Sequence, residues 1–281
     1  MADASLGSVI RLFALTLALL AVTASVAGAS APRKKKVVPP LVSNTIHVVV
    51  PRGQPIQIAF AADSRFDGTP SLAQAIQMAV DNHGGVLGFP IRINTVNAST
   101  CGSPPNTVSA ATTAAYTITA HLQNVAVLGQ VCSHGFAQAL AIYQKAGMVV
   151  VSGSATNPAL PAAGPTVFNR TIVDDNRVAD WYPVISQLPS DLAWRLDYTV
   201  KFGAPPSDFA DLYYDAAIIV LNDIAAASQV DAKGELIVNR AALATAVRNT
   251  SSYPGVTCSV TIDPVTGNRT DDEAAISACA G

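Results

Sequence analysis

The stretch that decides the fold is VAVLGQVCSHGFAQALAIYQKAGMVVVSGSATNPAL, residues 125–160. It opens with a short apolar run at 125–129, which predicts a buried strand, and a second such run follows at 148–152. Between them, residues 135–146 carry apolar side chains at helical spacing. A strand, a helix and a strand in this order form a βαβ unit, in which the two strands lie parallel in one sheet.

The same alternation continues on both sides of this unit. We expect further strands at 56–61, 91–96 and 166–170, and further helices at 71–82 and 107–121. Ser71 and Gln74 have the spacing of a capping box, which predicts that Ser71 caps the first helix. The pattern predicts the α/β class, with a three-layer, doubly wound, mostly parallel sheet in one main lobe.

The alternation of predicted strands and helices ends after Asp175. We expect helices at 181–201, 208–227 and 239–248, the first starting at Pro183 and interrupted by Pro189, and the second capped by Ser207. Residues 257–262 predict a strand, and the turn at 263–268 predicts a hairpin. The lobe is therefore expected at residues 54–255, and a C-terminal strand and hairpin tail at 256–281.

The composition is that of a globular protein. The chain has 281 residues, of which 50% are hydrophobic and 13% charged, so it can bury a sizeable core. The formal net charge is -2, and the sequence shows no basic face of the kind that nucleic-acid binding needs. We therefore expect no nucleic-acid partner.

The N-terminal segment predicts export. Residues 12–27 form an apolar run behind Arg11, and the small residues Ala27-Gly28-Ala29 at its end match a cleavage site, so we expect a signal peptide at residues 1–29. An uncleaved membrane anchor is the alternative, although the run is short for a bilayer span. No cysteine follows the cleavage site as in a lipobox. The expected location is periplasmic or secreted.

A basic run follows the apolar segment. Arg33, Lys34, Lys35 and Lys36 precede Pro39-Pro40, and we expect a basic, proline-containing linker at residues 30–53. Positive charge prefers the cytoplasmic side of a membrane, which opposes the export prediction. Attraction to lipid headgroups is the alternative role for this run.

Four cysteines, Cys101, Cys132, Cys258 and Cys279, are far apart and show no C-x-x-C spacing. This spacing gives little support to a zinc or thioredoxin-like site. An even number in an exported chain predicts disulfides, and three pairings are open. We favour the sequential pairing, in which each bond closes a short loop; four buried thiols are the alternative.

A ligand site is expected beyond the carboxyl ends of the parallel strands, where helix N-termini present free N–H groups. Ser133 and Thr156 lie in two such loops, and their hydroxyls could donate to a carboxylate. The alternatives are that Ser133 is only a helix N-cap and that Thr156 is an ordinary turn residue. His134 is expected to be a surface or capping residue.

At these residues the chain resembles the type I periplasmic binding proteins for leucine, isoleucine and valine. The resemblance rests on residues 125–160, on VFNRTIVDD at 167–175, on AIQMAVDNHGGVLGFPI at 75–91 and on FADLYYDAAIIVL at 209–221. It implies that Ser133, Ser154 and Thr156 hold the carboxylate of a bound amino acid, and that Cys101 pairs with Cys132. It also implies an ABC permease in the membrane as a partner.

The chain departs from this family after Asp175. Family members have a second lobe there, whereas residues 181–201 of this chain look like a helical return into the first lobe. We therefore expect most of the second lobe to be missing.

The function expected from these observations is that of an extracytoplasmic solute-binding protein for branched-chain amino acids, without enzymatic activity, cofactor or metal. The alternative is a scaffold or sensory protein of the same fold that binds a partner or itself through the exposed lobe face. A hydrolase using Ser133 and His134 is a third hypothesis, but the sequence lacks the G-x-S-x-G elbow.

Overall fold

A computed structural model describes residues 47–102, 106–271 and 273–280. Its centre is a five-stranded parallel sheet in the order β3-β2-β4-β5-β6. The strands are β2 (Ile56–Ala62), β3 (Ile91–Asn97), β4 (Asn124–Gly129), β5 (Val149–Ser152) and β6 (Phe168–Arg170). All five strands lie at the expected positions.

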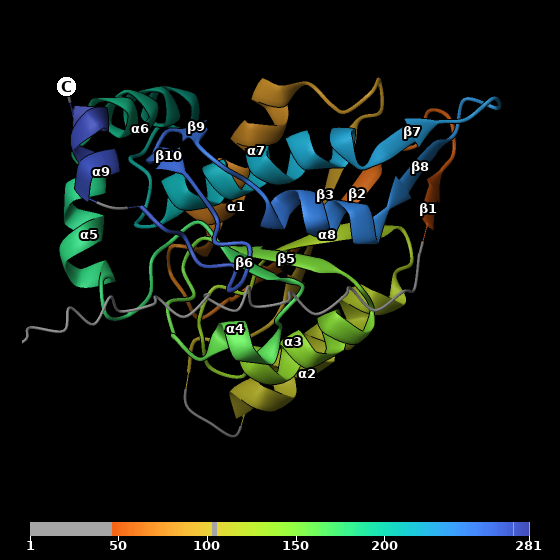
Figure 1. Ribbon diagram of the computed structural model, residues 1–281, viewed down its shortest axis with the longest axis horizontal. Helices are drawn as coiled ribbons and strands as arrows, with labels where there is room; N and C mark the ends of the chain where they lie inside the picture. The colour runs from red at the N-terminus through yellow and green to blue at the C-terminus, as the bar shows by residue number, and fades with distance from the viewer. Residues whose placement is uncertain (1–46, 103–105, 272, 281) are drawn as a thin grey trace, which may run out of the picture. The chain divides into compact units, whose positions relative to one another are not determined.

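Helices cover both faces of this sheet, as Figure 1 shows. On one face lie α1 (Thr69–His83), α7 (Ala210–Ala226) and α8 (Arg240–Arg248); on the other lie α2 (Asn106–Ala120), α3 (Phe136–Lys145) and the short α4 (Leu160–Ala163). Alternate residues of β2 supply the two cores: Ile58 and Phe60 pack with the first group, whereas Ala59 and Ala61 pack with the second. The predicted three-layer α/β architecture is confirmed.

A second, antiparallel sheet was not predicted. It contains β1 (His47–Val50), β8 (Leu236–Asn239) and β7 (Ser228–Val230), in that order. Val48 and Val50 alternate with exposed residues and enter the core, so residues 47–50 are a strand rather than part of the expected linker. The rest of that linker, residues 30–46 with the basic run, and the predicted signal peptide lie outside the described residues.

The chain after β6 forms α5 (Val178–Ile185) and α6 (Pro189–Phe202) before α7 returns to pack against α1. Pro183 was expected to start the first of these helices, which is wrong. The helix begins earlier because the Asp174 carbonyl accepts hydrogen bonds from the N–H groups of Arg177 and Val178. Helix α5 ends at Ile185, and Pro189 is the first residue of α6, so the helical stretch is interrupted before Pro189.

Two predicted helix caps are also wrong. Helix α1 begins at Thr69 after Gly68, and α7 begins at Ala210 after Phe209, so neither has a side-chain cap. The Ser71 hydroxyl instead bonds the Tyr198 hydroxyl at 2.9 Å, and the Ser207 hydroxyl donates to the Gly68 carbonyl at 3.3 Å. Both serines form hydrogen bonds between segments that are far apart in the sequence. A local sequence pattern cannot predict such contacts.

The C-terminal segment is part of the lobe rather than a tail. Strand β10 (Cys258–Val260) is shorter than expected and pairs with β9 (Tyr253–Gly255), so the predicted boundary at 255/256 divides a single hairpin. The expected turn at 263–268 is closed by a bridge between Ile262 and Arg269. Helix α9 (Glu273–Ala280) follows, and the disulfide Cys258–Cys279 attaches it to β10.

Across the described ranges there is a single parallel sheet, and α5, α6 and α7 follow Asp175 in succession, as expected for a chain with one main lobe. In these same ranges, no helix has the length and apolar character needed to cross a membrane.

Candidate functional site

The candidate site lies in the loops that follow β3, β4 and β5 at the carboxyl edge of the parallel sheet. The disulfide Cys101–Cys132 joins the first two of these loops. The N–H of Cys132 donates to the Thr100 hydroxyl at 3.0 Å, and the N–H of Cys101 donates to the buried Asp63 carboxylate after β2. Both sequential disulfides are therefore confirmed, and the first holds the loop that carries Ser133.

Ser133 connects the β4 loop to the β5 loop. Its hydroxyl oxygen accepts a hydrogen bond from the Asn157 N–H at 3.2 Å. The N-cap of α3 is Gly135 at φ 73°, without a side-chain hydrogen bond, so the interpretation of Ser133 as an ordinary N-cap is wrong. Glycine suits that position because the left-handed region is strained for other residues.

Thr156 presents two donors at the same place. Its carbonyl accepts from the Asp175 N–H at 2.9 Å. Within the described ranges, neither the N–H nor the hydroxyl of Thr156 has an acceptor, and the same is true of the Ser133 hydroxyl hydrogen. Both side chains are half-buried. The two residues thus offer three hydrogen-bond donors next to the Asn157–Ser133 contact.

Ser154 differs from these two residues because its hydroxyl is used inside the fold. It donates to the Val131 carbonyl at 2.6 Å, so the Tyr213 hydroxyl 3.1 Å away is the donor in their contact. Burial raises the pKa of Tyr213 to about 12, which keeps that hydroxyl protonated. Ser154 therefore fixes the β5 loop against β4 and α7.

His134 is exposed, and the hydrogen bond at the Ser133 hydroxyl comes from Asn157 rather than from the histidine ring. A nucleophile needs a base within hydrogen-bond reach. The arrangement gives the hydrolase hypothesis no support.

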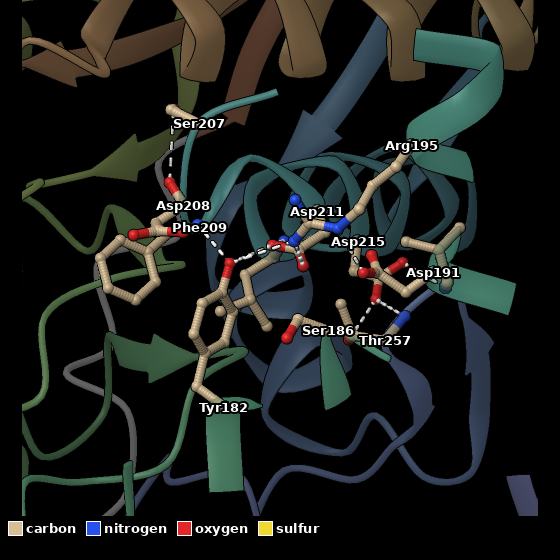
Figure 2. Close-up of polar contacts among 12 residues, drawn as sticks. Tyr182, Ser186, Asp191, Arg195, Ser207, Asp208, Phe209, Asp211, Asp215 and Thr257 are labelled. Atoms are coloured by element: carbon tan, nitrogen blue, oxygen red, sulfur yellow. Dashed lines mark hydrogen bonds and ion pairs between the residues drawn. The ribbon is translucent and has the colours of Figure 1, made fainter. Parts of the chain in front are cut away.

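A second polar cluster lies between α5, α6 and α7, and Figure 2 shows it. Arg195 contacts two fully buried carboxylates, Asp191 at 2.5 Å and Asp211 at 2.7 Å, and it donates to the Tyr182 hydroxyl at 3.2 Å. Burial, with the neighbouring Asp211 carboxylate, raises the pKa of Asp191 to about 7, and burial also raises that of Asp211.

This cluster was not predicted from the sequence. The spacing of Asp191 and Arg195 by four residues on one helix was a signal of an ion pair, but such pairs are usually exposed and weak. Only the packing of α6 on α7 reveals that Asp211 shares the same guanidinium. The cluster joins three helices, and nothing about it points to a ligand.

Comparisons with known proteins support the fold. No protein-family model matches the sequence. No curated protein matches it either. Solved structures do match: a protein described as a branched-chain amino acid ABC transporter from Rhodospirillum rubrum has a TM-score of 0.63 at 17% identity, over 78% of this chain and 96% of that chain.

Two further structures give similar values. The branched-chain amino acid substrate-binding protein LivJ of Streptococcus pneumoniae, in complex with isoleucine, has a TM-score of 0.61 at 15% identity, over 76% of this chain and 93% of the other. An ABC-transporter solute-binding protein of Rhodopseudomonas palustris, in complex with 3,4-dihydroxybenzoic acid, has a TM-score of 0.61 at 10% identity, over 78% of this chain and 91% of the other. The chain therefore has the type I periplasmic-binding-protein fold.

Proposed function

We propose that this protein binds a small solute through its carboxylate, at a half-site formed by Ser133 and Thr156 and supported by Ser154. The observation that carries the proposal is the group of three donors without an acceptor among the described residues: the Ser133 hydroxyl, the Thr156 hydroxyl and the Thr156 N–H. A carboxylate accepts several such hydrogen bonds at once, and each is strengthened by its charge.

The structural neighbours support this ligand class. Their bound molecules include isoleucine, leucine, 3,4-dihydroxybenzoic acid and benzoate, which share a carboxylate and little else. Within this class we propose branched-chain amino acids as the ligands, and an ABC importer permease as the partner that receives them.

The affinity is expected to be weak. A single lobe contacts one side of a small ligand and leaves the other side in water, so the hydrogen bonds compete with solvent. An open half-site also leaves an amino group solvated, which avoids the cost of burying an unpaired ammonium.

Binding can be tested by calorimetry with leucine, isoleucine, valine and benzoate. We expect wild-type protein to bind at least one of them and Ser133→Ala to bind it about tenfold more weakly, the effect of one charge-assisted hydrogen bond. Ser251→Ala is the matched control, because Ser251 is an exposed serine in the loop between α8 and β9. Identical null titrations of wild type and Ser133→Ala would reject the site.

Export is the second part of this proposal. The apolar run at 12–27 and the small residues at 27–29 support a signal peptide and a periplasmic or secreted protein. A fusion of residues 1–53 to an enzyme that is active only outside the cytoplasm tests this. We expect activity; a reporter that remains inactive in the cytoplasm contradicts export.

A second candidate function, self-association, is favoured by the exposed face of α6. Leu192, Leu196 and Val200 follow one another at four-residue spacing and are 47%, 65% and 79% exposed. We propose a second copy of this chain as the partner. Antiparallel packing of two α6 helices about Leu196 brings Leu192 against Val200 of the second copy, so apolar side chains meet across the interface.

Sedimentation over a range of concentrations tests this interface. We expect wild type to form a dimer and Leu196→Lys to remain a monomer. Leu122→Lys is the control, because Leu122 is 69% exposed at a site outside α6. A wild-type protein that stays monomeric at all concentrations contradicts the proposal.

A further inference from the structure

Arg170 is a fully buried arginine whose role the proposed half-site has not used. It begins the RTIVDD segment, residues 170–175, and ends β6. Burying a guanidinium is costly unless its donors are paired. The hydrogen bonds that Arg170 makes therefore indicate its role.

The contacts of this segment converge on one short piece of backbone. The Arg170 Nη1 donates to the Ala155 carbonyl at 3.2 Å and to the Asn157 carbonyl at 3.4 Å. The Asp175 N–H donates to the Thr156 carbonyl at 2.9 Å. All three successive carbonyls of residues 155–157 are thus held by the RTIVDD segment.

This restraint acts on the ligand donors of the half-site. With its carbonyl bound to Asp175, Thr156 has a fixed peptide orientation, and its N–H and hydroxyl have no acceptor among the described residues. The next peptide places the Asn157 N–H on Ser133. Arg170 therefore bonds to the same backbone segment, residues 155–157, that carries the Thr156 donors and contacts the Ser133 hydroxyl.

The guanidinium of Arg170 lies near two carboxylates, those of Asp174 and Asp175, and both favour its charged form. Its Nη2 lies 3.7 Å from the Asp174 carboxylate, whose side chain is 24% exposed, and the guanidinium lies 5.7 Å from the Phe168 ring centre. In the described part of the chain, its Nε makes no hydrogen bond. Burial lowers the pKa of Arg170 to about 10, so the side chain remains charged at neutral pH. A charge in a low-dielectric position acts over a longer distance than an exposed one.

Resting on the proposed function, we propose that Arg170 is the positioning residue of the half-site, holding the 155–157 loop in its donor-presenting form and making the site select a carboxylate over a neutral amide. It does not touch the ligand. Its effect comes through the loop and through its positive charge.

The test measures the ratio of affinities for leucine and leucinamide, or for benzoate and benzamide, in wild type, Arg170→Gln and Arg170→Lys. We expect Arg170→Gln to weaken carboxylate binding about tenfold while amide binding changes little, and Arg170→Lys, which keeps the charge, to retain part of the preference.

Arg248→Gln is the matched control. Arg248 is also buried, burial lowers its pKa to about 10 as well, and it donates to the Phe168 carbonyl at 2.6 Å and to Asn169 at 2.8 Å, away from residues 155–157. Its loss should lower stability and leave the carboxylate-to-amide ratio unchanged.

The outcomes separate the two proposals. Wild type that binds no carboxylate overturns the proposed function and the selectivity role together. Wild type that prefers carboxylates, with an unchanged ratio in Arg170→Gln or an equal change in Arg248→Gln, overturns the role of Arg170 alone. If Arg170→Gln fails to fold, the ratio in Arg170→Lys decides: a preference that is smaller than that of wild type supports the role of Arg170, and a ratio equal to that of wild type contradicts it.

Discussion

The guanidinium of Arg195 lies 2.7 Å from the buried carboxylate of Asp211, and the same side chain also holds Asp191. Two buried carboxylates therefore share one cation, which favours a proton on one of them. The pKa of Asp191 is raised to about 7, first by burial and then by Asp211.

We predict that the free energy of unfolding falls as the pH rises from about 4 to 7. In the folded protein Asp191 keeps its proton up to about pH 7, whereas in the unfolded chain it ionises near its ordinary value of about 4. The folded state therefore binds more protons in this window, and raising the pH removes stability. The loss assigned to Asp191 should be about 1–2 kcal/mol, because Asp191 and Asp211 share one guanidinium and titrate as a pair, so only part of the shift belongs to Asp191.

Urea unfolding of wild type and Asp191→Asn at several pH values checks this. Burial also raises the pKa of Asp215 and Asp223 to about 6, so these groups contribute a slope of the same sign in both proteins. The difference between the two proteins isolates Asp191. Parallel pH profiles for wild type and Asp191→Asn would contradict the assignment.

The two disulfides should have different effects on function. The bond Cys101–Cys132 spans 31 residues and holds the loop that carries Ser133, so the double variant Cys101→Ala/Cys132→Ala should lower both stability and ligand affinity. The stability loss should be about 3–4 kcal/mol in the chain-entropy model.

The other bond provides the control for this prediction. Cys258–Cys279 spans 21 residues and attaches α9 to β10. Cys258→Ala/Cys279→Ala should cost about 3 kcal/mol of stability and leave affinity unchanged. Calorimetric titration with equal affinity losses in the two double variants would show that the first disulfide has no specific role at the site.

The parallel sheet could be predicted from the sequence because each strand is a short apolar run followed by a helical pattern, and few other folds fit this pattern. The strands β1, β7 and β8 were missed because they do not belong to the strand–helix–strand alternation, and the partner of β1 is almost 190 residues away in the sequence. Local patterns carry no information on such pairing.

The candidate site could be assembled only in part from the sequence, for the same physical reason. Ser133 and Thr156 could be placed together because the carboxyl ends of parallel strands share one edge. The use of Ser154 depends on Tyr213 from α7, and the Asp191–Arg195–Asp211 cluster depends on the packing of two helices. Neither contact could be inferred without the fold.

Ser154 and Ser133 should separate stability from binding. The Ser154 hydroxyl bonds the Val131 carbonyl and the Tyr213 hydroxyl, so Ser154→Ala removes both hydrogen bonds and should cost about 1–2 kcal/mol of stability. Ser133→Ala removes one contact to Asn157 at the half-buried edge and should cost well under that. Thermal unfolding compares the two variants, and a larger loss in Ser133→Ala would contradict the division of roles.

Asp215 should contribute strongly to the stability of the fold. On α7 it accepts from the Val256 N–H at 2.9 Å, from the Thr257 N–H at 3.0 Å and from the Thr257 hydroxyl at 2.5 Å, as Figure 2 shows in part. These bonds fix the turn of the β9–β10 hairpin onto the core. Asp215→Ala leaves these buried donors unpaired and should cost about 3 kcal/mol, measured by urea unfolding.

Two further variants show whether the loss of stability in Asp215→Ala comes from the hydrogen bonds of this carboxylate. Asp215→Asn keeps one acceptor oxygen and should recover part of the stability. Asp208→Ala removes an exposed carboxylate just before α7 and should change stability by less than about 0.5 kcal/mol. Equal stability of Asp215→Ala and Asp208→Ala would mean that the hairpin is held by its apolar contacts, such as Val260 and Ile262 in the core, rather than by the carboxylate.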